Sequence, residues 1–363
     1  MTVVHGLPAI QFREESGREY SLDILRILSI SGVVAIHIFG YVVGHAKPDT
    51  KTWWIAAGLD IPFIWVVPVF VMISGALVLA PRAGASKPGN FYRKRAVRLI
   101  PALVAWHVIY LAGVRFLMRG EDLTFARTFQ LLTDGSVFTQ LYFLWLILGL
   151  YAVSPLLSAF IHAGSRRRAQ VLATVLLGLT ALVFMVPGIA GALGLSRPVA
   201  LNIFTQWMPY AGYFVAGWAL KGIRLKGLAL AGTVVAVFGL AALCTWQYGH
   251  RGRTGILDVV APVSYVSVTV MALSIAVFVA GNSVFSRVRP SPDAGRFLIA
   301  VSNASFGVFL VHMLIFEAIR LNFASVSGGQ SLVPAAVTYV STLILSFAVS
   351  MIASRMPYAR AIF

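Results

Sequence analysis

The sequence predicts an all-α integral membrane protein, a bundle of about ten transmembrane helices. Apolar and aromatic residues make up 59% of the 363 residues, charged residues make up only 11%, and the mean hydropathy is +0.85. Soluble globular domains carry about 25% charged residues, so lipid is expected to be the main solvent of this chain. Apolar runs long enough to cross a bilayer, about 20 residues each, recur from one end of the sequence to the other.

The expected spans are separated by short polar connections such as HAGSRRR and KGIRLKG. The first twenty residues are polar and lack the short apolar core of a cleavable signal peptide, so the first span is expected to remain in the mature protein. The ten apolar runs lie at residues 22–44, 55–80, 99–118, 136–160, 169–190, 203–220, 228–247, 259–281, 297–319 and 333–354.

We expect a single membrane domain over residues 21–356. A cytoplasmic segment, residues 1–20, would precede it, and a short cytoplasmic tail, residues 357–363, would follow it. Cys244 is the only cysteine and lies inside an apolar run. That excludes a disulfide framework or a thiolate metal site, and no metal site is expected.

The basic residues predict the orientation, because cytoplasmic loops carry the excess of Lys and Arg. With the N-terminus inside, nineteen of the 29 Lys and Arg residues fall in cytoplasmic segments, nine fall in the opposite loops, and Arg26 alone lies within a span. Both termini are therefore expected in the cytoplasm, in a multi-pass protein of the plasma (inner) membrane. The net charge of +17 is spread among these short loops, so no nucleic-acid partner is expected.

The first span contains three ionisable residues, Asp23, Arg26 and His37. Such side chains are costly at membrane depth, and by default they face a cavity or a partner and indicate function. Arg26 and His37 are eleven residues apart, about three turns and roughly 16 Å of rise, so they share one helix face. Asp23 can reach Arg26 as an i, i+3 pair. A structural alternative stays open, in which Arg26 snorkels to the interface and His37 makes an interhelical hydrogen bond.

Three further segments carry candidate residues, each with a structural alternative. FYRKRAVRLIP places Arg95 and Arg98 on one helix face, where two guanidinium groups suit a phosphate-bearing ligand, although the segment also fits a positive-inside loop. Tyr142 belongs to the aromatic run LYFLWLILGLYAVSPLL, which equally fits an interfacial belt. His312, in SFGVFLVHMLIF, and His107 also fit structural roles.

Taken in order, these segments resemble the membrane-bound type 3 acyltransferase family, integral membrane enzymes that O-acylate surface polysaccharides, lipids and related acceptors. The resemblance rests on LDILR followed, after ten intervening residues, by His37, then PVFVMISGALVL, FYRKRAVRLIP, LYFLWLILGLYAVSPLL and FGVFLVHMLIF. These segments cover nearly the whole chain. The aromatic-rich fourth span is most similar to the surface polysaccharide O-acetyltransferases.

The resemblance implies an O-acyltransferase that moves an acyl group, expected to be acetyl, from cytoplasmic acyl-CoA to a hydroxyl of a cell-envelope polysaccharide or lipid-linked glycan. Acyl-CoA would be a co-substrate, and no permanently bound cofactor is implied. The implied roles are catalytic for His37 and Arg26, supporting for Asp23, acyl-CoA-binding for Arg95 and Arg98, and substrate-pocket for Tyr142 and His312.

Several alternatives stay open. His37 could act as a general base near neutral pH, with Arg26 stabilising the oxyanion or a donor phosphate, or it could form a covalent acyl-histidine. A multi-span transporter or flippase of an envelope precursor also suits intramembrane charges, although the sequence shows no pair of interrupted helices at matching places in two halves. An acyltransferase of the other large membrane class would pair Asn303 with His312, but the first-span pattern would then be unexplained.

Overall fold

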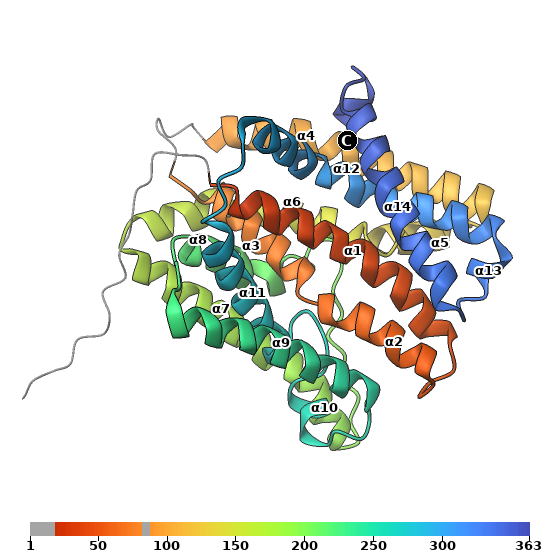
Figure 1. Cartoon of the computed structure of the whole chain (residues 1–363), viewed down its shortest axis with the longest axis horizontal. Helices are drawn as coiled ribbons and strands as arrows, with labels where there is room; N and C mark the ends of the chain where they lie inside the picture. Colours follow the sequence, from red (N-terminus) through yellow and green to blue (C-terminus); the bar gives the residue numbers. More distant parts are fainter. Residues whose placement is uncertain (1–18, 82–87) are drawn as a thin grey trace, which may run out of the picture.

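The computed structural model describes residues 19–81 and 88–363, and all regular structure in that part is helical (Figure 1). Most of the expected N-terminal segment 1–20, and Arg82 and Lys87 of the basic loop, lie outside the described residues. The predicted fold class is confirmed, because nine helical segments of the described part are long and apolar enough to cross a membrane. They are α1 (Ser21–His45), Lys51–Val78 with α2 and α3, Pro88–Met118 with α4 and η2, α6 (Tyr142–His162), α7 (Arg166–Ala192), α9 (Gly227–Gly249), α11 (Val268–Phe285), α12 (Pro292–Asn322) and α14 (Leu332–Ala353).

The remaining expected run, residues 203–220, does not form a helix of membrane length. It folds as a 3₁₀ turn, η3 (Met208–Tyr210), followed by α8 (Ala211–Leu220), and ten helical residues rise only about 15 Å, half of a hydrocarbon core. The chain nevertheless returns to the end of the bundle where α7 begins, because Gly222 lies against the Arg166 side chain. Which end of the bundle faces the cytoplasm remains a prediction from the charges.

The second span is interrupted halfway. Thr50 caps α2 (Lys51–Asp60) by accepting a hydrogen bond from the Trp53 backbone N–H at 3.3 Å. After Asp60 the chain forms the 3₁₀ turn η1 (Ile61–Phe63), and α3 (Val66–Val78) follows. Pro62 has no N–H for an α-helical hydrogen bond, which favours a break here. The apolar pattern indicated neither this interruption nor the one before α8.

The third span changes its winding partway. α4 (Pro88–Val108) begins eleven residues before the expected apolar run, with the basic segment that contains Arg95 and Arg98. It continues as a ten-residue π-helix, η2 (Ile109–Met118). Shorter helices complete the described part: α5 (Phe125–Thr133), α10 (Ile256–Val260), α13 (Ala324–Ser327) and the 3₁₀ turn η4 (Ala359–Ala361).

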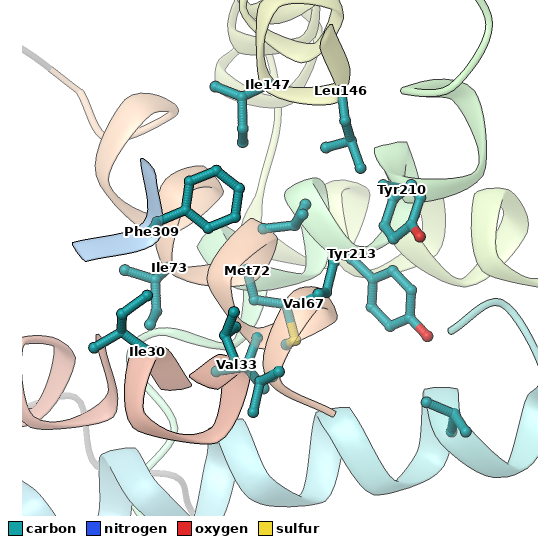
Figure 2. Packing of buried hydrophobic residues seen from close by; sticks show 14 of the residues in the cluster. Ile30, Val33, Val67, Met72, Ile73, Leu146, Ile147, Tyr210, Tyr213 and Phe309 are labelled. Carbon is teal, nitrogen blue, oxygen red and sulfur yellow. The ribbon is translucent and has the colours of Figure 1, made fainter. Parts of the chain in front are cut away.

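α1 lies at the centre of the bundle, where it packs against α2, α3, α11, α12 and α14 (Figure 1). Side chains of α1, α3, α6, η3, α8 and α12 converge in the core, including Ile30, Met72 and Phe309 (Figure 2). α3 and α8 approach to backbone contact, because a β-carbon on Gly75 would lie 1.8 Å from the carbonyl oxygen of Phe214. In the most apolar stretches of α7 and α9, only 28% and 11% of the residues are buried, so most of the surface of these two helices faces lipid.

Candidate active site

A buried serine links the two charged residues at the start of α1. The Ser302 hydroxyl of α12 donates to Asp23 Oδ1 at 2.7 Å and accepts from Arg26 Nη1 at 3.3 Å. Ser302 is fully buried and Asp23 is buried, whereas Arg26 is half-buried. Arg26 is therefore held through a neighbouring helix, and its guanidinium group remains partly accessible.

The accessible side of Arg26 faces a cavity of about 340 Å³, which Arg95 and Arg98 of α4 also line. The structure thus brings Arg26 together with two arginines that follow it by about seventy residues in the sequence. Arg95 is half-buried, with its guanidinium carbon 5.0 Å from the centre of the Tyr151 ring of α6. That contact orients Arg95 by a cation–π interaction. One end of the cavity is therefore cationic.

The rest of the cavity wall is largely apolar and aromatic, with Phe70 of α3, Phe143 of α6 and Phe309 of α12 among the lining residues. A charged end joined to an apolar wall is typical of sites that bind a ligand with an anionic head and a less polar arm. Val33 marks how far the cavity extends along α1. His37 follows one helical turn later on the same face.

His37 and His312 form a pair beyond the inner end of the cavity. Their ring centroids are 5.3 Å apart and the rings are inclined by 39°. His312 is buried, and its Nδ1 lies 3.0 Å from the Val308 carbonyl oxygen, while its Nε2 has no hydrogen-bond partner within the described part of the chain. Phe309 lines the cavity and also contacts the His312 ring, at 6.1 Å between centroids. The histidine pair therefore adjoins the cavity without lining it.

Tyr142 and His107 do not join this arrangement. Tyr142 is not among the residues that line the cavity, although its neighbours Phe143 and Leu144 are. His107 is buried, and both of its ring nitrogens have partners: Nδ1 lies 2.7 Å from the Leu103 carbonyl oxygen, and Nε2 accepts from Trp145 Nε1 at 3.0 Å. These contacts give His107 a structural role in holding α4 to α6.

Asn303 lines the arginine-rich cavity, but it lies on α12 together with His312. The alternative acyltransferase class would place the asparagine and the histidine on different helices, so this pair does not fit that class. No cluster of three or more metal-ligating side chains occurs within residues 19–81 and 88–363.

The sequence alone gave no role to Glu317 or to Asp60. Glu317 is buried and binds two arginines, Arg119 at 2.7 Å and Arg320 at 2.7 Å, at the end of α12 opposite to Ser302. Asp60 is buried at the break between α2 and η1, beside Gly40 of α1. A signal for Asp60 was present, since it is an acidic residue inside an apolar run. Ser302 gave no comparable signal, because serine is common in membrane helices.

Comparison with known families supports the interpretation of the chain as an acyltransferase. A family model described as an acyltransferase domain matches residues 19–355. Comparisons with curated proteins and with solved structures give no significant match. The matched range contains all nine long helices and every candidate residue described above, and it places the chain among acyltransferases rather than transporters. The chain belongs to the membrane-bound type 3 acyltransferase family.

Proposed function

We propose that this enzyme transfers an acyl group, of acetyl size, from acyl-CoA on the cytoplasmic side to a hydroxyl group of a cell-envelope polysaccharide or lipid-linked glycan. One observation carries the proposal: Arg26, Arg95 and Arg98 line a single cavity, and that cavity ends beside the His37–His312 pair. The cationic end suits the donor, and the histidine pair suits the reaction.

The donor's phosphates would bind Arg95 and Arg98 at the mouth of the cavity, because guanidinium groups match phosphate oxygens in charge and geometry. The pantetheine arm would extend along Phe143 and Phe309 towards α1. A volume of about 340 Å³ is sufficient for such an arm, while the nucleotide would remain outside. The thioester would reach the histidine pair past Phe309.

In the proposed reaction, His37 takes the proton of the acceptor hydroxyl as the oxygen attacks the thioester carbonyl carbon. A C–O bond forms, the C–S bond breaks, and the CoA thiolate leaves and recovers a proton from the imidazolium. Arg26, held by Ser302, stabilises a donor phosphate or the developing oxyanion. A covalent acyl-histidine would instead place the acyl group on a ring nitrogen before the acceptor binds.

The acceptor would approach from the opposite end of the bundle. Tyr41 lies one turn beyond His37 on α1, and the Arg320 guanidinium carbon lies 5.6 Å from the centre of its ring. The polar groups of Tyr41, Arg320 and Glu317 would thus lie on the side from which a glycan hydroxyl reaches His37. The donor and the acceptor would then meet at His37 without sharing an entrance.

The decisive test compares His37→Gln with His107→Gln in protein reconstituted into vesicles with acetyl-CoA and an envelope glycan fraction. Loss of a general base lowers the rate about a hundredfold to ten-thousandfold, so His37→Gln should be nearly inactive while still binding acetyl-CoA. His107→Gln, at a histidine with two structural contacts, should keep most of the activity. A His37→Gln protein that acylates the glycan at more than about a tenth of the normal rate would refute the catalytic assignment.

Donor binding has its own matched control on the same helix. Arg95→Ala and Arg98→Ala each remove charge-assisted hydrogen bonds worth about 1.5–3 kcal/mol, so acetyl-CoA affinity should fall at least tenfold for each. Arg93 is exposed on α4 and does not line the cavity, so Arg93→Ala should leave the affinity unchanged. Equal affinities in all three variants would contradict acyl-CoA as the donor in this cavity.

A further inference from the structure

A second groove lies on the outside of the bundle, where α6 ends and α7 begins. It has a volume of about 400 Å³ and shares no lining residue with the arginine cavity. Phe160 of α6 and Ser165 form one end, and the rest is a single face of α7. The groove is therefore separate from the proposed active site.

One end of this groove is cationic. Arg167 and Arg168 are both exposed and line it, and none of the lining residues is acidic. The Arg168 guanidinium carbon lies 4.1 Å from the centre of the Phe160 ring, which orients that group over an apolar surface. Two adjacent guanidinium groups without an acidic partner in the groove suit a phosphate.

The other end is apolar and continues along α7. Val171, Leu172 and Val175 line it, and Val175 lies about 10 Å along the helix from Arg168. Val171 and Val175 are 55% and 50% exposed, and further exposed apolar residues, such as Leu182, follow on the same helix. In a membrane-spanning helix this surface must contact hydrocarbon. A soluble phosphate compound would leave the apolar wall uncovered, whereas a lipid acyl chain would cover it.

We propose that this groove is a binding site for an anionic phospholipid. The phosphate would bind Arg167 and Arg168, and one acyl chain would lie along Phe160, Val171 and Val175. Basic pockets between membrane helices recognise anionic headgroups in this way. Because both arginines precede the lipid-facing part of α7, the headgroup and the chain would be bound at the depths they already occupy in a bilayer.

The test uses the purified full-length protein in detergent, with bound lipid counted by native mass spectrometry during titration with dioleoyl phosphatidylglycerol. We expect phosphatidylglycerol to bind at least tenfold more tightly than dioleoyl phosphatidylcholine, and Arg167→Ala with Arg168→Ala to abolish that preference. Arg355→Ala removes an exposed cation at the end of α14 and should have no effect. Equal binding of the two lipids, or an unchanged preference in the double variant, would overturn the proposal.

A second variant separates a lipid from a simple phosphate ion. Val175→Trp fills the apolar end and leaves both arginines in place, so it should weaken phosphatidylglycerol binding several-fold. Inorganic phosphate at millimolar concentration should compete poorly, because it cannot occupy the apolar wall. If Val175→Trp binds phosphatidylglycerol normally and inorganic phosphate displaces the lipid, the site recognises the anion alone and the lipid assignment is wrong.

Discussion

Substitution of Gly75 tests how closely α3 and α8 must pack. A β-carbon at this position would lie 1.8 Å from the Phe214 carbonyl oxygen and 2.6 Å from its carbonyl carbon. Real β-carbons essentially never approach within 3.0 Å of another heavy atom, so Gly75→Ala requires the two helices to move apart by about 1.2 Å. The obstacle is backbone in a regular helix, which cannot rotate away as a side chain can.

Overpacking of a closely fitted core costs about 1–3 kcal/mol, and a backbone clash belongs at the upper end of that range. Scaling the unfolding entropy of soluble domains to 363 residues converts 1 kcal/mol into about 1.3 °C. Gly75→Ala should therefore lower the midpoint of thermal unfolding by about 4 °C. Cys244 is the only cysteine and is fully buried, so a thiol-reactive fluorophore in detergent solution reports unfolding of the bundle directly.

Gly178 and Gly232 are matched controls, because a β-carbon at either position meets no atom within 4 Å. Alanine is preferred over glycine inside a helix by roughly 0.5–1 kcal/mol, so Gly178→Ala and Gly232→Ala should leave the midpoint unchanged or raise it. The two classes of variant thus differ in sign. A Gly75→Ala protein as stable as the Gly178→Ala protein would refute the close α3–α8 packing.

Other predictions follow from single contacts. Glu317→Ala should destabilise the protein by about 3 kcal/mol in the Cys244 assay, because it leaves two arginines without their buried acid; Asp293→Ala, which breaks an exposed pair with Arg296, should cost less than about 1 kcal/mol. Asp60→Asn should raise the unfolding midpoint in the same assay, because a buried ionisable side chain is costly inside a membrane. In intact cells, an impermeant thiol reagent should label Lys47→Cys but not Ala163→Cys. Labelling of Ala163→Cys alone would show that the predicted orientation is wrong.

The apolar runs were sufficient to predict most of the fold, because a membrane-spanning helix needs a continuous apolar stretch as long as the hydrocarbon core is thick. The first span was expected at 22–44 and is found at Ser21–His45, and the last was expected at 333–354 and is found at Leu332–Ala353. Hydropathy fails where an apolar run is not one helix. The expected span 259–281 begins only at Val268, since residues 261–267 around Pro262 are not helical.

The candidate site was predictable only in part. Arg95 and Arg98 could be associated by their spacing along one helix, and Arg26 with His37 in the same way. The meeting of the three arginines in one cavity depends on how α1, α4 and α12 pack, and periodicity within a helix carries no information about its neighbours. For the same reason the contact between His37 and His312 was not expected, although both residues had been singled out.

The contacts between α1 and α12 nevertheless follow a spacing that is visible in the sequence. Arg26 meets Ser302, and eleven residues later His37 meets His312, ten residues after Ser302. Two helices that run side by side in the same direction keep such a correspondence only if their rise is matched over about 15 Å. A shift of α12 by one turn would break the hydrogen bond at Arg26 and separate the two rings together. The hydrophobic effect does not hold helices together in lipid, because lipid tails are as apolar as the side chains, so such a register depends on van der Waals packing and on polar contacts. The polar contacts therefore have a structural task besides any chemical one: they position His312 against His37 at the depth where the arginine cavity ends.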